Sequence, residues 1–251
     1  MVTSSSPLVE RLDWDSEFFG RAIGRARVGR LDASIAARLA ADARAAGLTC
    51  VYFAAGIDDF ETVCAAEEMG FHLVDVRVVL ERPELTTMPG AAADADCTIE
   101  PAREGDLPRL EQIATEVARL SRYAADPRFR PDETDRLYRT WIRNAWDGYV
   151  DTVLVARAAD GTVLGFGCPK MHGELCDLQL LGVAGAQRQR KVGRALVLAA
   201  MAWGREQGAT RMQAVTQGRN VPAQRLFQQL GFLTAEVKLY YHLWLTPAAD
   251  R

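Results

Sequence analysis

The sequence is poor in cysteine and histidine and has no long apolar run. Its five cysteines include no C-x-x-C pair, which argues against disulfides and a zinc site and predicts a reducing cytoplasm. The three histidines lie far apart, so no metal site is expected. Apolar runs such as 195–203 fall short of the roughly 20 residues that a membrane span needs. The polar first residues lack the apolar stretch of a secretion signal.

A basic excess is also missing. The 251 residues include 30 basic and 33 acidic side chains, and the resulting net charge of −3 argues against a nucleic-acid partner. Because 27 of the basic residues are Arg and only 3 are Lys, a single Arg is weak evidence for a binding site. With 49% apolar and 25% charged residues, the composition is that of a globular protein rather than a coiled coil or a fibre.

One segment interrupts the chain. Residues 82–96, RPELTTMPGAAADAD, contain Pro, Gly and small residues without periodicity, which predicts a linker. We expect an N-terminal α/β domain at 1–85, a linker at 86–96 and a larger domain at 97–251. In the larger domain, the apolar spacing predicts helices over 104–121, 131–146, 193–207 and 221–230. Strands are expected over 97–101, 152–158, 162–169, 175–183 and 212–216, with one or two more over 233–245.

The first part of the chain repeats the ending of the second. Gly70-Phe71 and Gly231-Phe232 are 161 positions apart, and the same offset superposes further identical residues. The shared order is helix, glycine, strand, helix, Gly-Phe and strand. The sequence therefore predicts a half-domain fused ahead of a complete one.

The most informative segment is a polar loop between a predicted strand and a predicted helix. The first N–H groups of a helix have no partner within it, and the helix dipole is positive there, so a diphosphate fits this position. The groups expected to meet it are the backbone of Gln189–Gly193 and the side chains of Arg188, Arg190 and Lys191. A plain connection with a solvated basic loop is the alternative. In the first part, residues 25–34 take the equivalent place without paired glycines or a basic run, so a packing role is expected there.

The loop resembles the acyl-CoA pyrophosphate loop of the GNAT superfamily of N-acyltransferases, whose pattern is Q/R-x-x-G-x-G/A. It reads Arg188-Gln-Arg-Lys-Val-Gly193, so Lys191 replaces the first glycine and still offers its N–H if its φ is negative. The family's second signature, N-x-x-A-x-x-L/F-Y-x-x-x-G-F, is matched from Asn220 to Phe232, except that Phe227 replaces the tyrosine. The resemblance implies an α/β (α+β) fold: a GNAT domain with a mixed, mostly antiparallel sheet flanked by helices, preceded by a half-GNAT-like region.

The resemblance also implies an N-acetyltransferase that uses acetyl-CoA as co-substrate and no metal. The residues that it assigns to the cofactor are Leu181, Gly182, Val183, Arg188, Gln189, Arg190, Lys191, Val192, Gly193, Arg194, Asn220 and Phe227. An acid on the strand before the loop often accepts the amine proton in this family, and Asp177 holds that position, with Glu174 a weaker candidate and a solvent-facing role the alternative.

A different problem arises at the leaving group. The family tyrosine protonates the departing thiolate, which Phe227 cannot do. Tyr240 and Tyr241 are candidate substitutes, although core packing is the favoured alternative for both. A thiol with a pKa of about 8.5 is also a competent leaving group without help.

The substrate end is similar to family members that acetylate an amino-deoxy sugar carried on TDP. The similarity lies in residues 12–20, 120–130 and 137–142. It implies a small-molecule amine acceptor whose diphosphate pairs with Arg122, Arg128 and Arg130 and whose base or sugar stacks on Tyr123. A solvated arginine-rich loop is the alternative. Another amine (an antibiotic, a polyamine or a protein N-terminus) and a non-catalytic acyl-CoA-binding module are other options, and a homodimer stays open.

Overall fold

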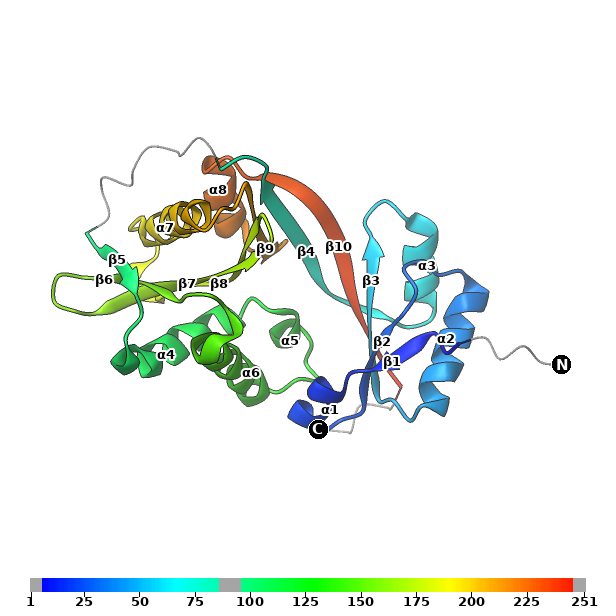
Figure 1. Ribbon diagram of the computed structural model, residues 1–251. Coiled ribbons are helices and arrows are strands. Elements are labelled where there is room, and N and C mark those ends of the chain that lie inside the picture. Colours follow the sequence, from blue (N-terminus) through cyan, green and yellow to red (C-terminus); the bar gives the residue numbers. More distant parts are fainter. Residues whose placement is uncertain (1–5, 86–95, 246–251) are drawn as a thin grey trace. The chain divides into compact units, whose positions relative to one another are not determined.

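The computed structural model describes residues 6–85 and 96–245 (Figure 1). They form two compact units, one with residues up to Arg77 and from Val237 onward, the other with Val78–Glu236. The linker expected at 86–96 lies almost wholly outside the described residues, so the expected domain limits stay a prediction. No helix in 6–85 or 96–245 has the length and apolar character that a membrane crossing requires.

The first unit is a small sheet with three helices. Its elements are β1 (Val9–Arg11), α1 (Asp13–Phe19), β2 (Ile23–Ala26), α2 (Ala33–Ala45), β3 (Cys50–Gly56), α3 (Phe60–Glu68), the start of β4 (His72–Arg82) and most of β10 (Leu233–Trp244). Strand β2 pairs antiparallel with β1 and parallel with β3, and β3 pairs antiparallel with β10. The last strand of the chain therefore completes the sheet of the first unit.

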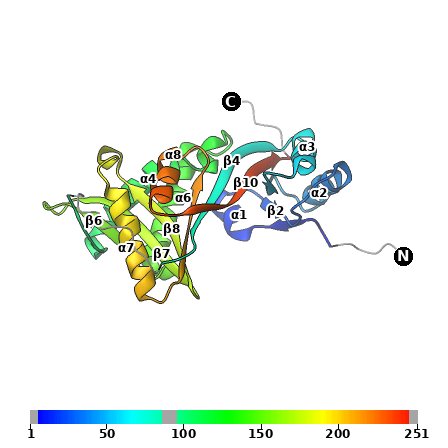
Figure 2. The ribbon, with the colours of Figure 1, turned by 90° about the horizontal axis from the view of Figure 1, so that it is seen from above.

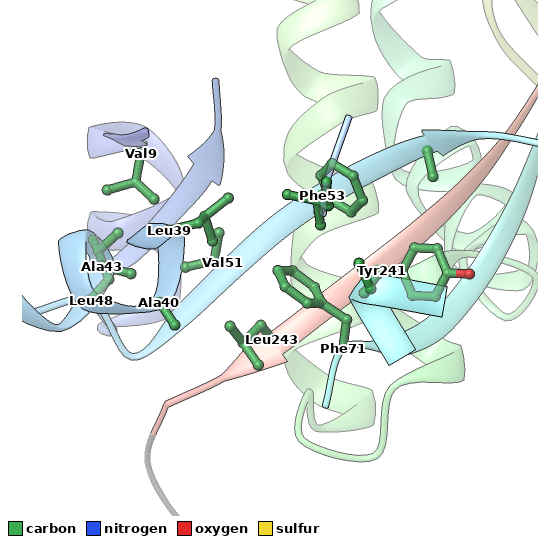
Figure 3. Packing of buried hydrophobic residues seen from close by; sticks show 14 residues of the cluster. Val9, Leu39, Ala40, Ala43, Leu48, Val51, Phe53, Phe71, Tyr241 and Leu243 are labelled. Carbon is green, nitrogen blue, oxygen red and sulfur yellow. The ribbon is translucent and has the colours of Figure 1, made fainter. Parts of the chain in front are cut away.

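The core of the first unit is aromatic around β3 and β10. Figure 3 shows the side chains of Phe53, Phe71 and Tyr241 within the same buried cluster. The ring centroids of Phe53 and Phe71 are 5.5 Å apart, and those of Phe53 and Tyr241 are 6.3 Å apart. Leu243 belongs to the same buried cluster, so β10 supplies core side chains as well as backbone pairing.

The second unit carries the longer sheet. Its elements are the end of β4, β5 (Thr98–Pro101), a 3-10 turn (Glu104–Asp106), α4 (Leu107–Ala118), α5 (Arg122–Ala125), α6 (Pro131–Asn144), a π-type turn (Ala145–Tyr149), β6 (Leu154–Arg157), β7 (Val163–His172), β8 (Leu175–Val183), a 3-10 turn (Gly185–Gln187), α7 (Val192–Glu206), β9 (Arg211–Gln217), α8 (Val221–Gln229) and the start of β10. The strand order is β4-β9-β8-β7-β6-β5, with β8 and β9 parallel and the pairs from β5 to β8 antiparallel.

Helices cover both faces of this sheet. Helix α7 packs on β7 and β8 from one side, and α4, paired with α6, packs on them from the other (Figure 1). Seen from above, α7 lies across these strands (Figure 2). The α+β fold expected from the sequence, a mixed sheet flanked by helices, is confirmed.

The bounds of the elements confirm the predicted repeat. Strand β3 and helix α3 of the first half recur 161 positions later as β9 and α8 with the same lengths, and β4 recurs as β10. The β2-α2-β3 and β8-α7-β9 segments are both parallel crossovers. The first half is therefore a half-GNAT-like region.

The short elements were not predicted. Strands β1 and β2 and helices α1 and α5 contain three to seven residues each, too few for a readable period. The helix expected over 131–146 is α6 up to Asn144 and continues as the π-type turn Ala145–Tyr149, inside which Gly148 leaves the helical conformation with φ at 99°. The stretch 233–245 forms one strand rather than two.

Candidate active site

Strands β8 and β9 run side by side only over their first residues. Their parallel register begins with Leu175 opposite Arg211 and ends with Leu178 opposite Ala214. Beyond this point β8 continues against β7 as far as Val183. Among residues 6–85 and 96–245, no strand pairs there with the edge of β8 that faces away from β7, so its backbone groups can pair with a ligand.

A β-bulge lies where the two strands separate. Cys168 is opposite Leu180 and Pro169 is opposite Leu178, so Gln179 is an extra residue on β8. The proline stands where the register shifts, and prolines within sheets are found mainly at bulges and on edge strands.

The bulge changes which face of the sheet the following side chains occupy. Cys176 faces α7, since a Cβ on Gly204 would lie 2.9 Å from its sulfur. Gly182 faces α4, since a Cβ there would lie 3.2 Å from Ile113. Two residues six positions apart would share a face in a regular strand, so the extra residue has reversed the alternation.

Two backbone positions on β8 point toward the open edge. The N–H of Ala184 donates to the carbonyl of Leu164 at 2.9 Å, one position beyond the last register pair, Gly165 opposite Val183. In an antiparallel ladder, hydrogen-bonded and non-hydrogen-bonded pairs alternate. The N–H and C=O groups of Val183 and Leu181 therefore point away from β7, as a role in holding an extended ligand requires.

The loop after β8 contains two left-handed residues. The φ angle is 66° at Gln189 and 61° at Lys191. Lys191 therefore does not meet the condition of a negative φ. It adopts a left-handed conformation, which costs an L-residue about 1–2 kcal/mol.

Helix α7 begins directly after this turn without a side-chain cap. Lys191 is the N-cap residue, and no side-chain hydrogen bond caps the helix. The first-turn N–H groups of Val192 and Gly193 therefore have no side-chain cap and lie at the positive end of a 15-residue helix. Arg188 and Arg190 are exposed beside it. An anion of the size of a phosphate fits these donors.

Gly193 lets the start of α7 lie close to its neighbours. A Cβ at Gly193 would lie 3.2 Å from Leu226 of α8 and 3.6 Å from Val183 of β8. The start of α7 is thus packed closely against α8 and against the end of β8.

The equivalent helix of the first half, α2, has a side-chain cap at its N-terminus. The Asp32 carboxylate accepts the N–H of Ile35 at 2.7 Å and caps α2. The N–H of Leu31 donates to the Thr62 hydroxyl at 2.9 Å. A carboxylate at this position repels a phosphate, so α7 is the one of the two related helices that can accept an anion.

Asp177 lies on β8 just before the bulge. The Gln179 amide donates to its Oδ2 at 2.6 Å, and its partners in the strand registers are Lys170 on β7 and Gln213 on β9. Since Cys176 faces α7, Asp177 faces the other side of the sheet. The carboxylate is half-buried and ordered by a neighbouring donor. Its role as a base stays a prediction.

Asn220 and Phe227 have local structural roles. The Asn220 side-chain oxygen accepts the N–H of Ala223 at 3.3 Å and caps α8. Phe227 is buried, with its ring centroid 5.2 Å from that of Phe232. A larger polar ring at position 227 would meet this packed contact.

Tyr240 and Tyr241 lie on the part of β10 that belongs to the first unit, where they are opposite Ala54 and Phe53 of β3. Tyr241 is 1% exposed, and burial raises the pKa of its phenol. The structure therefore does not place either tyrosine in the unit that holds the loop.

The predicted acceptor residues have partners of their own. Arg130 pairs with Asp132 at 3.0 Å and with Glu133 at 3.5 Å, and the Asp132 hydrogen bond is the main reason that its pKa is raised. Arg122 donates to the Tyr123 hydroxyl at 2.8 Å and lies over its ring.

Tyr123 is 3% exposed and packs edge-on against Phe129. The backbone N–H of Arg128 donates to the buried carboxylate of Asp126 at 2.9 Å. A binding role for these four predicted residues stays a prediction.

Sequence reasoning missed four polar residues at this site. They are Glu116, whose carboxylate accepts the N–H of Gly185 at 2.6 Å, Gln179, Lys170 and Tyr149. Lys170 had a readable signal, because a lysine is unusual in a chain with 27 Arg and 3 Lys. Within 6–85 and 96–245, no group of three or more His, Cys, Asp and Glu side chains is arranged to hold a metal.

Known proteins match both the sequence and the fold. Residues 114–232 match the acetyltransferase (GNAT) family. The dTDP-fucosamine acetyltransferase of Escherichia coli O6:H1 is 30% identical over 225 residues, 89% of this chain and 92% of that protein. The spore coat polysaccharide biosynthesis protein SpsD of Bacillus subtilis is 27% identical over 57% of this chain, which spans half of that protein.

A solved structure extends the likeness along the chain. A functionally unknown conserved protein from Staphylococcus epidermidis superposes with a TM-score of 0.65 over 96% of this chain and 92% of that one, at 14% identity. This identity supports the fold alone. With the family match and the relative that aligns over nearly its full length, the chain belongs to the GNAT family of acetyltransferases, which are acyl-CoA-dependent N-acyltransferases.

Proposed function

We propose that this protein transfers the acetyl group of acetyl-CoA to the amino group of an amino-deoxy sugar carried on a nucleoside diphosphate of the TDP type. The observation that carries the proposal is the open edge of β8 leading into an uncapped helix start. The nature of the acceptor rests on the similarity to the dTDP-fucosamine acetyltransferase, supported by the polysaccharide biosynthesis protein.

The cofactor end is assigned to the loop and the strand edge. The first-turn N–H groups of α7 would hold the diphosphate, with Arg188 and Arg190 adding charge. The backbone of Leu181 and Val183 would pair with the pantetheine arm, and the N–H of Val183 would polarise the thioester carbonyl. Asn220 would reach the same arm with its amide nitrogen, since its oxygen caps α8.

The chemistry is direct transfer. The amine nitrogen attacks the thioester carbon, the carbon–sulfur bond breaks, and the amine proton passes to Asp177, directly or through water. An acyl-cysteine intermediate on this sheet is disfavoured, because burial raises the pKa of Cys176 to about 12 and also raises that of Cys168.

The thiolate is proposed to leave without a proton donor. Phe227 has no proton to give, and the hydroxyl of Tyr241 is enclosed in the core of the first unit. A thiol pKa of about 8.5 makes the thiolate stable enough to depart at neutral pH. Phe227→Tyr is therefore expected to change kcat less than threefold, and a large rise would refute this step.

The test is release of CoA thiol from acetyl-CoA with a panel of amines: TDP-linked amino sugars, an aminoglycoside, a polyamine and a peptide with a free N-terminus. We expect turnover with a TDP-linked amino sugar and loss of turnover in Asp177→Asn. Turnover with the polyamine or peptide alone would refute the proposed acceptor, and unchanged activity in Asp177→Asn would refute the base. Calorimetry with CoA tests the loop separately, since Arg188→Ala should weaken binding severalfold.

The expected cytoplasmic location and the homodimer remain proposals. Fractionation of cells that express the protein with a tag tests the first, and sedimentation of the purified protein tests the second.

A further inference from the structure

We infer that Lys170 and Tyr149 form a subsite for the diphosphate of the acceptor. This inference rests on the proposed function and adds to it a binding site for the nucleotide side of the substrate. The Lys170 ammonium lies 4.0 Å from the centroid of the Tyr149 ring, and Tyr149 is 58% exposed. The ring is therefore accessible to solvent and holds a cation over its face.

The pair lies beside the proposed base. Lys170 on β7 is opposite Asp177 on β8 in the antiparallel register. Side chains of opposite residues share a face of the sheet and have Cβ atoms about 4.5–5.5 Å apart. Because Cys176 faces α7, Asp177 and Lys170 both lie on the face away from α7. A substrate whose amine meets Asp177 therefore has its next few atoms within reach of Lys170.

The ring is held in place by its own segment. Gly148, with φ at 99°, ends the turn after α6 in a conformation that other residues rarely adopt. Two residues after Tyr149, the Asp151 carboxylate accepts the N–H of Met171 on β7 at 2.6 Å. The segment is thus anchored to the strand on which Lys170 lies. Through this cation–π contact, Tyr149 positions the Lys170 ammonium.

The chemistry of the pair suits a diphosphate. An ammonium is a compact positive charge on a flexible stem and binds phosphate oxygens as a point charge. The predicted diphosphate partner Arg130 is instead paired with Asp132 and Glu133, and Arg122 lies on Tyr123. Lys170 is therefore the cation that the structure places next to the base.

The experiment compares two acceptors in steady-state kinetics: a TDP-linked amino sugar and the same amino sugar without the nucleotide. For Lys170→Ala we expect the KM of the TDP-linked acceptor to rise at least tenfold with kcat within threefold, while the KM of the plain amino sugar is unchanged. Lys170→Arg should recover part of the loss. Tyr149→Leu should raise the same KM severalfold.

Lys238→Ala is the matched control, since it removes one lysine charge from β10 in the first unit and should leave both KM values unchanged. A KM that is unchanged for both acceptors, or that rises equally for both, would overturn the subsite. A second measurement does not depend on turnover: calorimetry with dTDP should detect binding to the wild type and at least tenfold weaker binding to Lys170→Ala. Equal binding, or none to the wild type, would refute the subsite, whereas absent turnover with intact dTDP binding would refute the proposed reaction alone.

Discussion

Lys191→Gly tests whether the phosphate loop carries backbone strain. Lys191 has φ at 61°, a conformation that costs an L-residue about 1–2 kcal/mol. Glycine avoids this cost but loses about 0.5–1 kcal/mol through its greater freedom in the unfolded chain. The expected net effect is a stabilisation of roughly 0.5–1 kcal/mol. For a chain of this size, that corresponds to a rise in Tm of about 1–4 °C.

The assay is thermal unfolding followed by circular dichroism or calorimetry. Arg190→Gly is the matched control, because Arg190 is the exposed neighbour in the same loop and is not among the residues with positive φ. It should lower Tm slightly, since it gains the entropic cost of glycine without relieving strain. Lys191→Ala keeps the strain and removes the charge, so it should not raise Tm and should raise the KM for acetyl-CoA.

The reasoning is refuted if Lys191→Gly and Arg190→Gly lower Tm equally. That result would mean that the left-handed turn costs this loop nothing, and that the lysine fits the position as well as glycine does.

Other perturbations give equally direct outcomes. Glu116→Ala should raise the KM for acetyl-CoA severalfold at constant kcat, because it removes the acceptor 2.6 Å from the N–H of Gly185. Glu116→Gln should leave this KM unchanged, since its amide oxygen can still accept that N–H. A fall in kcat for both variants would contradict this reasoning. Gln179→Leu removes the donor to Asp177, so the acid limb of the kcat/KM profile should move to higher pH, and an unmoved limb would count against it. Arg157→Met should lower the free energy of unfolding measured in urea at pH 7, because it removes the ion pairs of Arg157 with Glu100 and Asp106. The hydrogen bond from Arg157 is the main reason that the pKa of Glu100 is lowered. The resulting stabilisation is present at pH values above the pKa that Glu100 has in the unfolded chain. The difference in unfolding free energy between wild type and variant should therefore shrink below about pH 4.

The elements that frame the site were readable from the sequence. Strand β8 has the predicted bounds, and α7 and α8 begin or end within one residue of them, because glycines end both helices and the apolar spacing is regular. The separation of β8 from β9 was not readable. It coincides with the bulge opposite Pro169, where the expected strand ended, whereas β7 continues to His172.

Side-chain roles were harder to predict than elements. Arg130 was expected to meet a ligand, yet the acids that hold it follow directly in the sequence at 132 and 133. Lys170 and Tyr149 were missed because their contact joins segments 21 positions apart across a turn that no period reveals. The conformation of Lys191 could not be predicted from its residue type, because the left-handed region is uncommon for residues other than glycine.

The pairing of β10 with β3 governs the order in which the protein can fold during synthesis. Cys50 lies opposite Trp244, so the sheet of the first unit closes only after nearly the whole described chain has left the ribosome. Contacts between residues so far apart in sequence form slowly. The N-terminal unit is therefore completed last. Until β10 has been synthesised, one edge of β3 is unpaired and can be bound by a chaperone or by the edge strand of another chain.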